Sequence, residues 1–375
     1  MTTSLILLND FKRQWADTGA DALAAVQRVG ESGWYVLGGE VTRFETLLAS
    51  ELGAGFCVGC ASGLDAIEIA LRALDLQPGT RVLTTPLSAF ATTLAIVRAG
   101  GIPVFADVDE TGNLDLERAA EHLSKRRDIT FMVPVHLYGH ALDLQRLGQL
   151  KTQFGLRVVE DCAQAIGASS GGQLAGSVGD LAAVSFYPTK NLGALGDGGA
   201  VFGRDASAKA ICESLRNYGQ SARYVHDRLG LNSRLDELHA AILAGAFLPK
   251  LGAWTKRRRE IAARYRDCIR HPEVQSMPAP RAEGSVWHLF PVLVPPARRA
   301  AFQAHLQANG VQSAIHYPTL IPDQAALNGV PFEVLGELTR ARQIASSVVS
   351  LPIHPYLSDD ELERVAAAVH AWGPP

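Results

Sequence analysis

Short apolar segments alternate with longer amphipathic segments between about residue 55 and residue 205. Runs rich in valine predict strands at 81–86, 103–108, 130–139, 157–161, 182–187 and 199–203. Apolar residues at helical spacing predict helices at 64–74, 90–100 and 115–125. Strands alternating with helices indicate β-α-β units, so we expect an α/β fold with a mostly parallel central sheet between helices.

The pattern changes after about residue 234, where a long helical stretch begins. A proline-rich connection at 272–284 then leads to a predicted strand in "VWHLFPVLV", a helix, the segment "SAIHYP" and a last helix near 359–371. This order predicts a smaller C-terminal α+β domain. We therefore divide the chain into a large domain, 1–250, and a small domain, 251–375.

Composition excludes several classes of protein. Hydrophobic residues make up 47% and charged residues 19% of the chain, which is ordinary for a globular protein. The net charge of −3 provides no general attraction to nucleic acid or to an acidic membrane. The basic cluster 256–259 lacks interleaved aromatic residues, so we interpret it as a solvated helix face. The N-terminal apolar run is too short for a signal peptide, and we expect a cytoplasmic protein.

The five cysteines do not resemble a secreted disulfide framework. Cys57 and Cys60 form a C-x-x-C pair, but no second pair stands at a spacing suited to zinc. Packing in the core is favoured over a redox or metal role, and we expect no metal site.

The stretch "SFYPTKNLGALGDGGAV" places Lys190 before a run of glycines. A P-loop needs its glycines before the lysine, and a dinucleotide fingerprint does not fit here either. A Schiff-base lysine does fit, because glycines let the backbone come close to an aldehyde cofactor such as pyridoxal 5'-phosphate. Asp161, at a strand end, is suited to hold the protonated ring nitrogen. Ser62 at a helix start, Ser185 and Phe90 are candidates for the phosphate and for the ring face.

Three longer segments, "VVEDCAQAIGAS", "GDLAAVSFYPTKNLGALGDGGAV" and "GLNSRLDELHAAIL", resemble the DegT/DnrJ/EryC1/StrS family of sugar aminotransferases. The resemblance covers nearly the whole chain and implies the aspartate aminotransferase fold, which is fold type I of the pyridoxal-phosphate enzymes. It implies Lys190 as the covalent anchor and Asp161 as the partner of the ring nitrogen. The other cofactor contacts that it implies are Gln164, Phe90, Ser185, Ser62, Gly63, Leu64 and Asn232.

Asn232 resembles an asparagine that reaches the phosphate from a neighbouring subunit, which implies a homodimer with shared active sites. Two positions depart from the family pattern. Thr189 stands where the family usually has glycine, so we expect a negative φ at this residue. Leu64 stands where many members have threonine, so only its backbone N–H could serve the phosphate.

The resemblance also bears on the reaction. Members that dehydrate a sugar carry histidine at the position of Lys190, so the lysine favours an aminotransferase. Segment 215–243 resembles members acting on dTDP-3-oxo-6-deoxyhexoses, with L-glutamate as the amino donor, and Tyr224, His316 and Tyr317 are candidate substrate contacts. A 4-aminotransferase, an aminocyclitol aminotransferase and a non-catalytic regulatory protein remain alternatives. A nucleotide-dependent oxidoreductase is disfavoured.

Overall fold

The computed structural model describes residues 5–373, so residues 1–4 of the N-terminal apolar run lie outside the described part. Its largest feature is an eight-stranded sheet with the strand order β1-β9-β8-β5-β4-β2-β3-β14. In that order the strands are β1 (Phe56–Cys60), β9 (Gly199–Gly203), β8 (Leu181–Ser185), β5 (Arg157–Asp161), β4 (Ile129–Val133), β2 (Arg81–Thr84), β3 (Ile102–Ala106) and β14 (Glu333–Leu335). Only β9 runs antiparallel to its neighbours, β1 and β8. The predicted mostly parallel sheet is confirmed.

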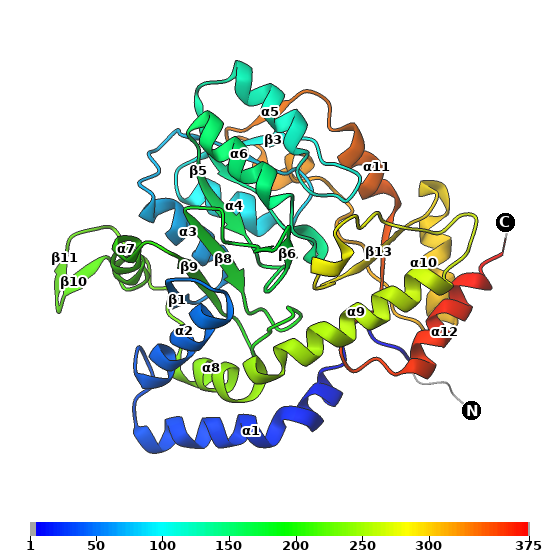
Figure 1. Ribbon diagram of the computed structural model, residues 1–375, viewed down its shortest axis with the longest axis horizontal. Coiled ribbons are helices and arrows are strands. Elements are labelled where there is room, and N and C mark those ends of the chain that lie inside the picture. Colours follow the sequence, from blue (N-terminus) through cyan, green and yellow to red (C-terminus); the bar gives the residue numbers. More distant parts are fainter. Residues whose placement is uncertain (1–4, 374–375) are drawn as a thin grey trace.

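Helices cover both faces of this sheet (Figure 1). They are α1 (Phe11–Ser32), α2 (Gly39–Glu51), α3 (Gly63–Ala73), α4 (Phe90–Arg98), α5 (Leu116–Lys125), α6 (Leu144–Phe154), α7 (Ala206–Arg216) and α8 (Glu237–Ile242). Side chains of α3, α4 and α7 form one core with the sheet, and α1, α2 and α8 form another on the opposite face. Alternation along β8 explains the two cores, since Ala183 belongs to one and Ala182 to the other.

The C-terminal part has its own small sheet, in which β13 (Phe290–Leu293) lies between β12 (Gln275–Ser276) and β15 (Val348–Leu351). Its helices are α9 (Leu251–Cys268), α10 (Arg299–Ala308), α11 (Thr339–Ser347) and α12 (Asp359–His370). A separate apolar core holds Tyr265, Phe290 and Phe302. The division at residue 250 stays a prediction, and β14 from this part of the chain extends the edge of the large sheet.

The remaining elements are short. Two hairpins pair β6 (Ser169–Ser170) with β7 (Gln173–Leu174) and β10 (Gln220–Ala222) with β11 (Val225–His226). Short 3-10 helical turns are η1 (Leu137–Gly139), η3 (Leu248–Lys250), η4 (Ala282–Gly284), η5 (Pro296–Arg298), η6 (Ile321–Asp323) and η7 (Ala325–Leu327), and η2 (Leu243–Phe247) is a wider π-helical segment. Within the described residues, no helix combines the length and apolar character needed to cross a membrane.

The carboxyl ends of the parallel strands bring the chemically interesting residues together. Strands β5 and β8 are parallel neighbours that end at Asp161 and Ser185. Helix α3 begins directly after β1, and Ser62 caps it by accepting a hydrogen bond from the Asp65 N–H at 3.1 Å. Ligand sites of such sheets lie at this edge, where strands end and helices begin.

Candidate active site

The turn after β8 carries Lys190. It is closed by a hydrogen bond from the Lys190 N–H to the carbonyl of Tyr187 at 2.8 Å. Thr189 does not have a positive φ, which confirms the expectation for this departure and explains why threonine is tolerated here. A Cβ atom on Gly193 would lie 2.3 Å from the carbonyl oxygen of Pro188. This glycine is therefore needed because the chain folds back closely on itself.

The Lys190 side chain is half-buried at the sheet edge. Burial lowers the pKa of its amine to about 8, although the negative charge of Asp161 acts in the opposite direction. An amine with this pKa is largely unprotonated in mildly alkaline solution. It can therefore act as a nucleophile and as a base, as a Schiff-base lysine must.

Asp161 is fixed from two sides. Its Oδ2 accepts a hydrogen bond from the Thr92 hydroxyl at 2.8 Å, and its Oδ1 accepts one from the Ala163 N–H at 3.0 Å. The residue is 4% exposed. Two donors hold the carboxylate in one orientation, which suits it to bind a positively charged group of a ligand. Thr92 is a site residue that the sequence interpretation missed.

The turn at the start of α3 has the geometry of a phosphate site. A Cβ atom on Gly63 would lie 2.6 Å from Cβ of Ser185, so only glycine lets the helix start approach β8 so closely. Among the described residues, the N–H groups of Gly63 and Leu64 have no hydrogen bond acceptor. Free N–H groups at a helix N-terminus favour an anion, and Leu64 needs no hydroxyl to contribute one.

Gln164 connects the large sheet to the C-terminal part. Its Oε1 accepts from the Tyr138 N–H at 2.7 Å, and its Nε2 donates to the Tyr317 hydroxyl at 3.0 Å. Burial raises the pKa of Tyr317 to about 12, with Gln164 opposing this shift and Asp161 adding to it. The Tyr138 hydroxyl donates to the carbonyl of His316. The structure therefore brings Gln164, His316 and Tyr317 together.

His316 is neutral at physiological pH. Burial, and after it the charge of Lys190, lowers the pKa of this imidazole to about 4. Its Nδ1 is paired with the Ser350 hydroxyl at 2.9 Å. His288, which the sequence interpretation did not select, also lies within electrostatic reach of Lys190, and burial lowers its pKa well below the ordinary value. Its Nδ1 pairs with Oδ1 of Asn191, the residue next to Lys190, at 3.2 Å.

Two of the predicted site residues, Tyr224 and Asn232, do not contact the residues around Lys190 within one chain. Tyr224 is 79% exposed in the β10–β11 hairpin, which projects from the body beside α7 at the left of Figure 1. Asn232 is exposed, and its side chain has no hydrogen bond to another described residue. Its neighbour Ser233 binds Asp65 in the first turn of α3, which fixes Asn232 close to the rim of that turn.

The basic cluster of α9 corrects the sequence interpretation. A solvated face was expected for 256–259, but Arg258 is 3% exposed and its Nη1 donates to the carbonyls of Trp287, His288 and Ile353. The interpretation failed because a run of four basic residues wraps around the helix, so that one of them must face the protein interior.

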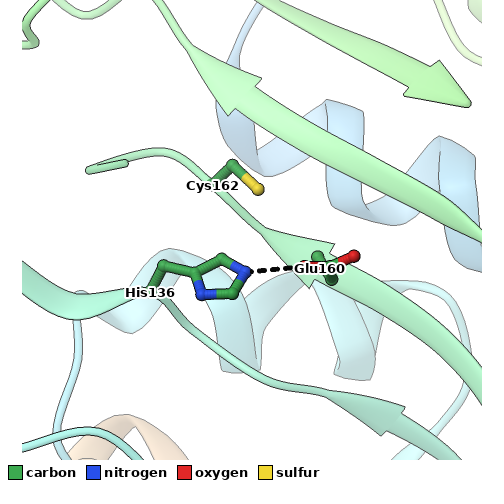
Figure 2. A group of neighbouring side chains, drawn as sticks. All are labelled: His136, Glu160 and Cys162. Atoms are coloured by element: carbon green, nitrogen blue, oxygen red, sulfur yellow. Dashed lines mark hydrogen bonds and ion pairs between the residues drawn. The ribbon is translucent and has the colours of Figure 1, made fainter. Parts of the chain in front are cut away.

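Cys57 and Cys60 pack in the core as free thiols, and burial raises the pKa of both. A different group, His136, Glu160 and Cys162, is buried on either side of Asp161 in the sequence, and the atoms of its side chains that could bind a metal lie within 4.8 Å of one another (Figure 2). His136 Nδ1 accepts from the Leu142 N–H at 3.1 Å, so Nε2 carries the proton that it donates to Glu160 at 2.8 Å. Neither ring nitrogen therefore offers a free lone pair to a metal.

The carboxylate of Glu160 is also fully engaged in hydrogen bonds within the protein. Burial would raise the pKa of its carboxyl, but His136 and the N–H groups of the 176–179 loop outweigh burial and lower it. The three loop N–H groups, from Gly176, Val178 and Gly179, donate to Glu160 at 2.9, 2.8 and 2.6 Å. This buried group ties the loop to β5, one residue before Asp161.

The sheet, the lysine after β8 and the carboxylate at the end of β5 define a type I pyridoxal-phosphate fold. Comparison with known proteins agrees. A solved structure of DesV from S. venezuelae, in complex with a ketimine intermediate, matches with a TM-score of 0.93 and 38% identity, covering 99% of each chain. A model of the DegT/DnrJ/EryC1/StrS aminotransferase family matches residues 16–370. The chain belongs to this family and is a pyridoxal-phosphate-dependent sugar aminotransferase.

Two relatives in sequence are informative. The dTDP-3-amino-3,6-dideoxy-alpha-D-galactopyranose transaminase of Aneurinibacillus thermoaerophilus is 43% identical over 350 residues, 93% of this chain and 94% of the relative. A pleiotropic regulatory protein of Geobacillus stearothermophilus is 34% identical over 362 residues, 96% of each chain. The predicted family and fold type are thus confirmed.

Proposed function

We propose that the protein transfers an amino group from L-glutamate to C3 of a dTDP-linked 3-oxo-6-deoxyhexose, which yields a 3-amino-3,6-dideoxy sugar. The observation that carries the proposal is Lys190 beside Asp161, an amine with a lowered pKa next to a doubly hydrogen-bonded carboxylate. The choice of the C3 ketone rests on the 43% identical transaminase, whose name states a 3-amino product.

The residues of the site fit pyridoxal 5'-phosphate. The free N–H groups of Gly63 and Leu64, with the hydroxyls of Ser62 and Ser185, would hold the phosphate. Asp161 would hold the ring nitrogen, Phe90 the ring face, and Gln164 the phenolic oxygen. The chemistry that the bound cofactor supplies is that of an electron sink for negative charge at the carbon beside the transferred nitrogen.

The chain's own residues then have defined tasks. Nζ of Lys190 would hold the cofactor covalently, and as a free amine it would carry the proton removed from Cα of the donor. Thr92 keeps the Asp161 carboxylate oriented. His316 and Tyr317 face Lys190 and Gln164 as neutral groups, so they can contact a sugar by hydrogen bonds without adding charge.

The projecting hairpin supports a shared site in a homodimer. Tyr224 is too exposed to serve the site of its own chain, and the Asn232 side chain is free to reach a second copy. Mixing Lys190→Ala with Asn232→Ala subunits tests this arrangement. Activity above that of either variant alone supports the shared site, and no recovery contradicts it.

Loss of the cofactor link tests the proposal most simply. The purified protein with pyridoxal 5'-phosphate should show the absorbance band of a lysine-linked cofactor, and Lys190→Ala should abolish that band. An unchanged spectrum contradicts the assignment of Lys190.

A non-catalytic regulatory role is the second candidate function, because one relative is named as a regulatory protein. Conversion of the bound cofactor to its pyridoxamine form by glutamate distinguishes the two, because a non-catalytic protein leaves it unchanged.

A further inference from the structure

Asn191 ties the turn that carries Lys190 to the C-terminal part of the chain. It is 5% exposed, and its Nδ2 donates a hydrogen bond to the carbonyl of Val286 at 2.8 Å. Its Oδ1 pairs with Nδ1 of His288 at 3.2 Å. Among the described residues, no other side chain of this lysine turn, residues 187–194, forms a hydrogen bond with the C-terminal part. The side-chain hydrogen bonds between the lysine turn and that part therefore all involve Asn191.

His288 is a neutral imidazole. It is 7% exposed, and burial, followed by the charges of Lys190 and Arg258, lowers its pKa well below the ordinary value. His316, the other histidine that acts on it, is neutral as well. The charge that acts on the lysine amine comes from Asp161. A neutral ring can therefore support the lysine turn without adding positive charge beside the amine.

The proton between the two side chains belongs to His288. The amide nitrogen of Asn191 is engaged with the carbonyl of Val286, so the amide oxygen faces the imidazole and can only accept. Nδ1 of His288 is therefore the donor, and Nε2 holds the lone pair of the neutral ring. Nε2 forms no hydrogen bond with another described residue. The bond to Asn191 is thus the polar contact through which this ring acts.

The backbone around His288 is held at several points. The N–H of Val286 donates to the carbonyl of Gly139 in η1 at 3.0 Å. A Cβ atom on Gly139 would lie 2.6 Å from the backbone nitrogen of His288, so the two segments touch. The buried guanidinium of Arg258 donates to the His288 carbonyl at 3.4 Å. Because its backbone is fixed in this way, His288 is a firm support for Asn191.

We propose that His288 is a positioning residue for Lys190 and that it acts through Asn191. This inference rests on the proposed role of Lys190 and adds the group that keeps its turn in place. The Nδ1 proton of His288 holds the Asn191 amide, and the amide holds the lysine turn against the C-terminal part. Reacting groups lose rate steeply when they are misplaced by about 1 Å. The restraint therefore bears on the rate of the chemical step and not on the binding of the amino donor.

The test compares His288→Phe with His288→Asn in the holoenzyme. Phenylalanine fills the space of the ring but has no proton to donate, whereas the amide of asparagine offers a donor close to the place of Nδ1. The rate at which glutamate removes the lysine-linked absorbance band gives a maximal rate and a half-saturating glutamate concentration. We expect the maximal rate to fall at least tenfold in His288→Phe and to recover most of this loss in His288→Asn. The half-saturating concentration should stay within about twofold of wild type in both.

His305→Phe is the matched control for the loss of a histidine contact. His305 lies on α10 in the same part of the chain, and its Nε2 pairs with the carbonyl of Ala368 at 2.8 Å. This variant should keep the maximal rate of wild type. An equal loss in His305→Phe and His288→Phe overturns the inference, and so does an unchanged maximal rate in His288→Phe.

A cycle of variants shows whether His288 acts through Asn191. Asn191→Leu removes both hydrogen bonds of the amide and keeps its approximate size. The variant with both changes should be as slow as Asn191→Leu alone, because the histidine then has nothing left to hold. Losses that multiply contradict the inference. Should His288→Phe fail to fold, Asn191→Leu is compared with His305→Phe, and the same fall in maximal rate is expected.

Hydrogen–deuterium exchange of the protein without cofactor tests the restraint apart from turnover. In His288→Phe the amides of the lysine turn should exchange about fivefold faster, because one neutral hydrogen bond is lost, while those of β13 keep their rate. Unchanged exchange in the lysine turn, or an equal increase in β13, overturns the inference. Failure of the proposed function looks different, because wild type itself then shows no lysine-linked band. The exchange measurement still decides in that case whether His288 holds the lysine turn.

Discussion

Replacement of Thr92 by valine removes the side-chain donor to Asp161, together with a longer contact of 3.5 Å to the Ser88 hydroxyl. Thr92 is 1% exposed on α4, and its hydroxyl donates to Oδ2 of Asp161 at 2.8 Å. Valine has nearly the same shape, so the change leaves the packing of α4 almost intact. What is lost is a donor to a buried carboxylate.

The size of the effect follows from the charge of the acceptor. A hydrogen bond to a charged group contributes about 1.5–3 kcal/mol, and Asp161 keeps only its bond from the Ala163 N–H. We therefore expect Thr92→Val to lower the free energy of unfolding by about 2 kcal/mol. Thr93 is the matched control because it is also buried, at 0% exposure, but its hydroxyl has no partner. Thr93→Val should leave the stability unchanged or raise it.

Urea unfolding of the two variants and wild type, without added cofactor, measures both changes under one set of conditions. Turnover should fall in Thr92→Val, because loss of the donor frees the Asp161 carboxylate to rotate. Equal stability of Thr92→Val and Thr93→Val would refute the assignment of a hydrogen bond between Thr92 and Asp161.

Three further predictions concern close packing and titration. Gly63→Ala should weaken cofactor binding at least tenfold in a titration with pyridoxal 5'-phosphate, because the new Cβ atom would collide with Ser185. Gly30→Ala in α1 is the control and should not weaken binding, because a Cβ atom there has nothing within 4 Å. In the protein without cofactor, the free energy of unfolding should rise between pH 8 and 10.5, because in this range the Lys190 amine binds a proton in the unfolded chain but not in the folded one. Lys190→Met should lack this contribution when unfolding in urea is measured over the same range. Stability should fall as the pH drops from 6.5 to 4, since the unfolded His316 imidazole gains a proton first; a slope no smaller in His316→Asn would contradict this.

Most of the sheet, and the strand ends that carry Asp161 and Ser185, could be predicted from the sequence because their signals are local. The strands ending at Asp161 and Ser185 form as the valine-rich runs predict, and the helix after Ser62 begins at its cap. Thr189 keeps an ordinary backbone, so the departure from the family pattern has no visible cost.

The missed residues depend on contacts between distant segments. Thr92 and Asp161 are 69 positions apart, and nothing in the sequence around Thr92 shows that its hydroxyl meets a carboxylate. The same holds for His288, which pairs with Asn191 over 97 positions. Arg258 was misjudged because helical phase, and not composition, decides which arginine of a basic run is buried. Tyr224 and Asn232 are exposed, so the cluster around Lys190 forms without them.

The position of the new amino group separates the proposed reaction, at the C3 ketone of a dTDP-linked sugar, from a reaction at C4. The most direct measurement incubates the holoenzyme with glutamate and either a dTDP-3-oxo-6-deoxyhexose or a dTDP-4-keto-6-deoxyhexose, and identifies the product by mass spectrometry and NMR. We expect a 3-amino sugar, formed together with 2-oxoglutarate, from the first substrate only. A 4-amino product from the second substrate, or no aminated sugar from either, would contradict it.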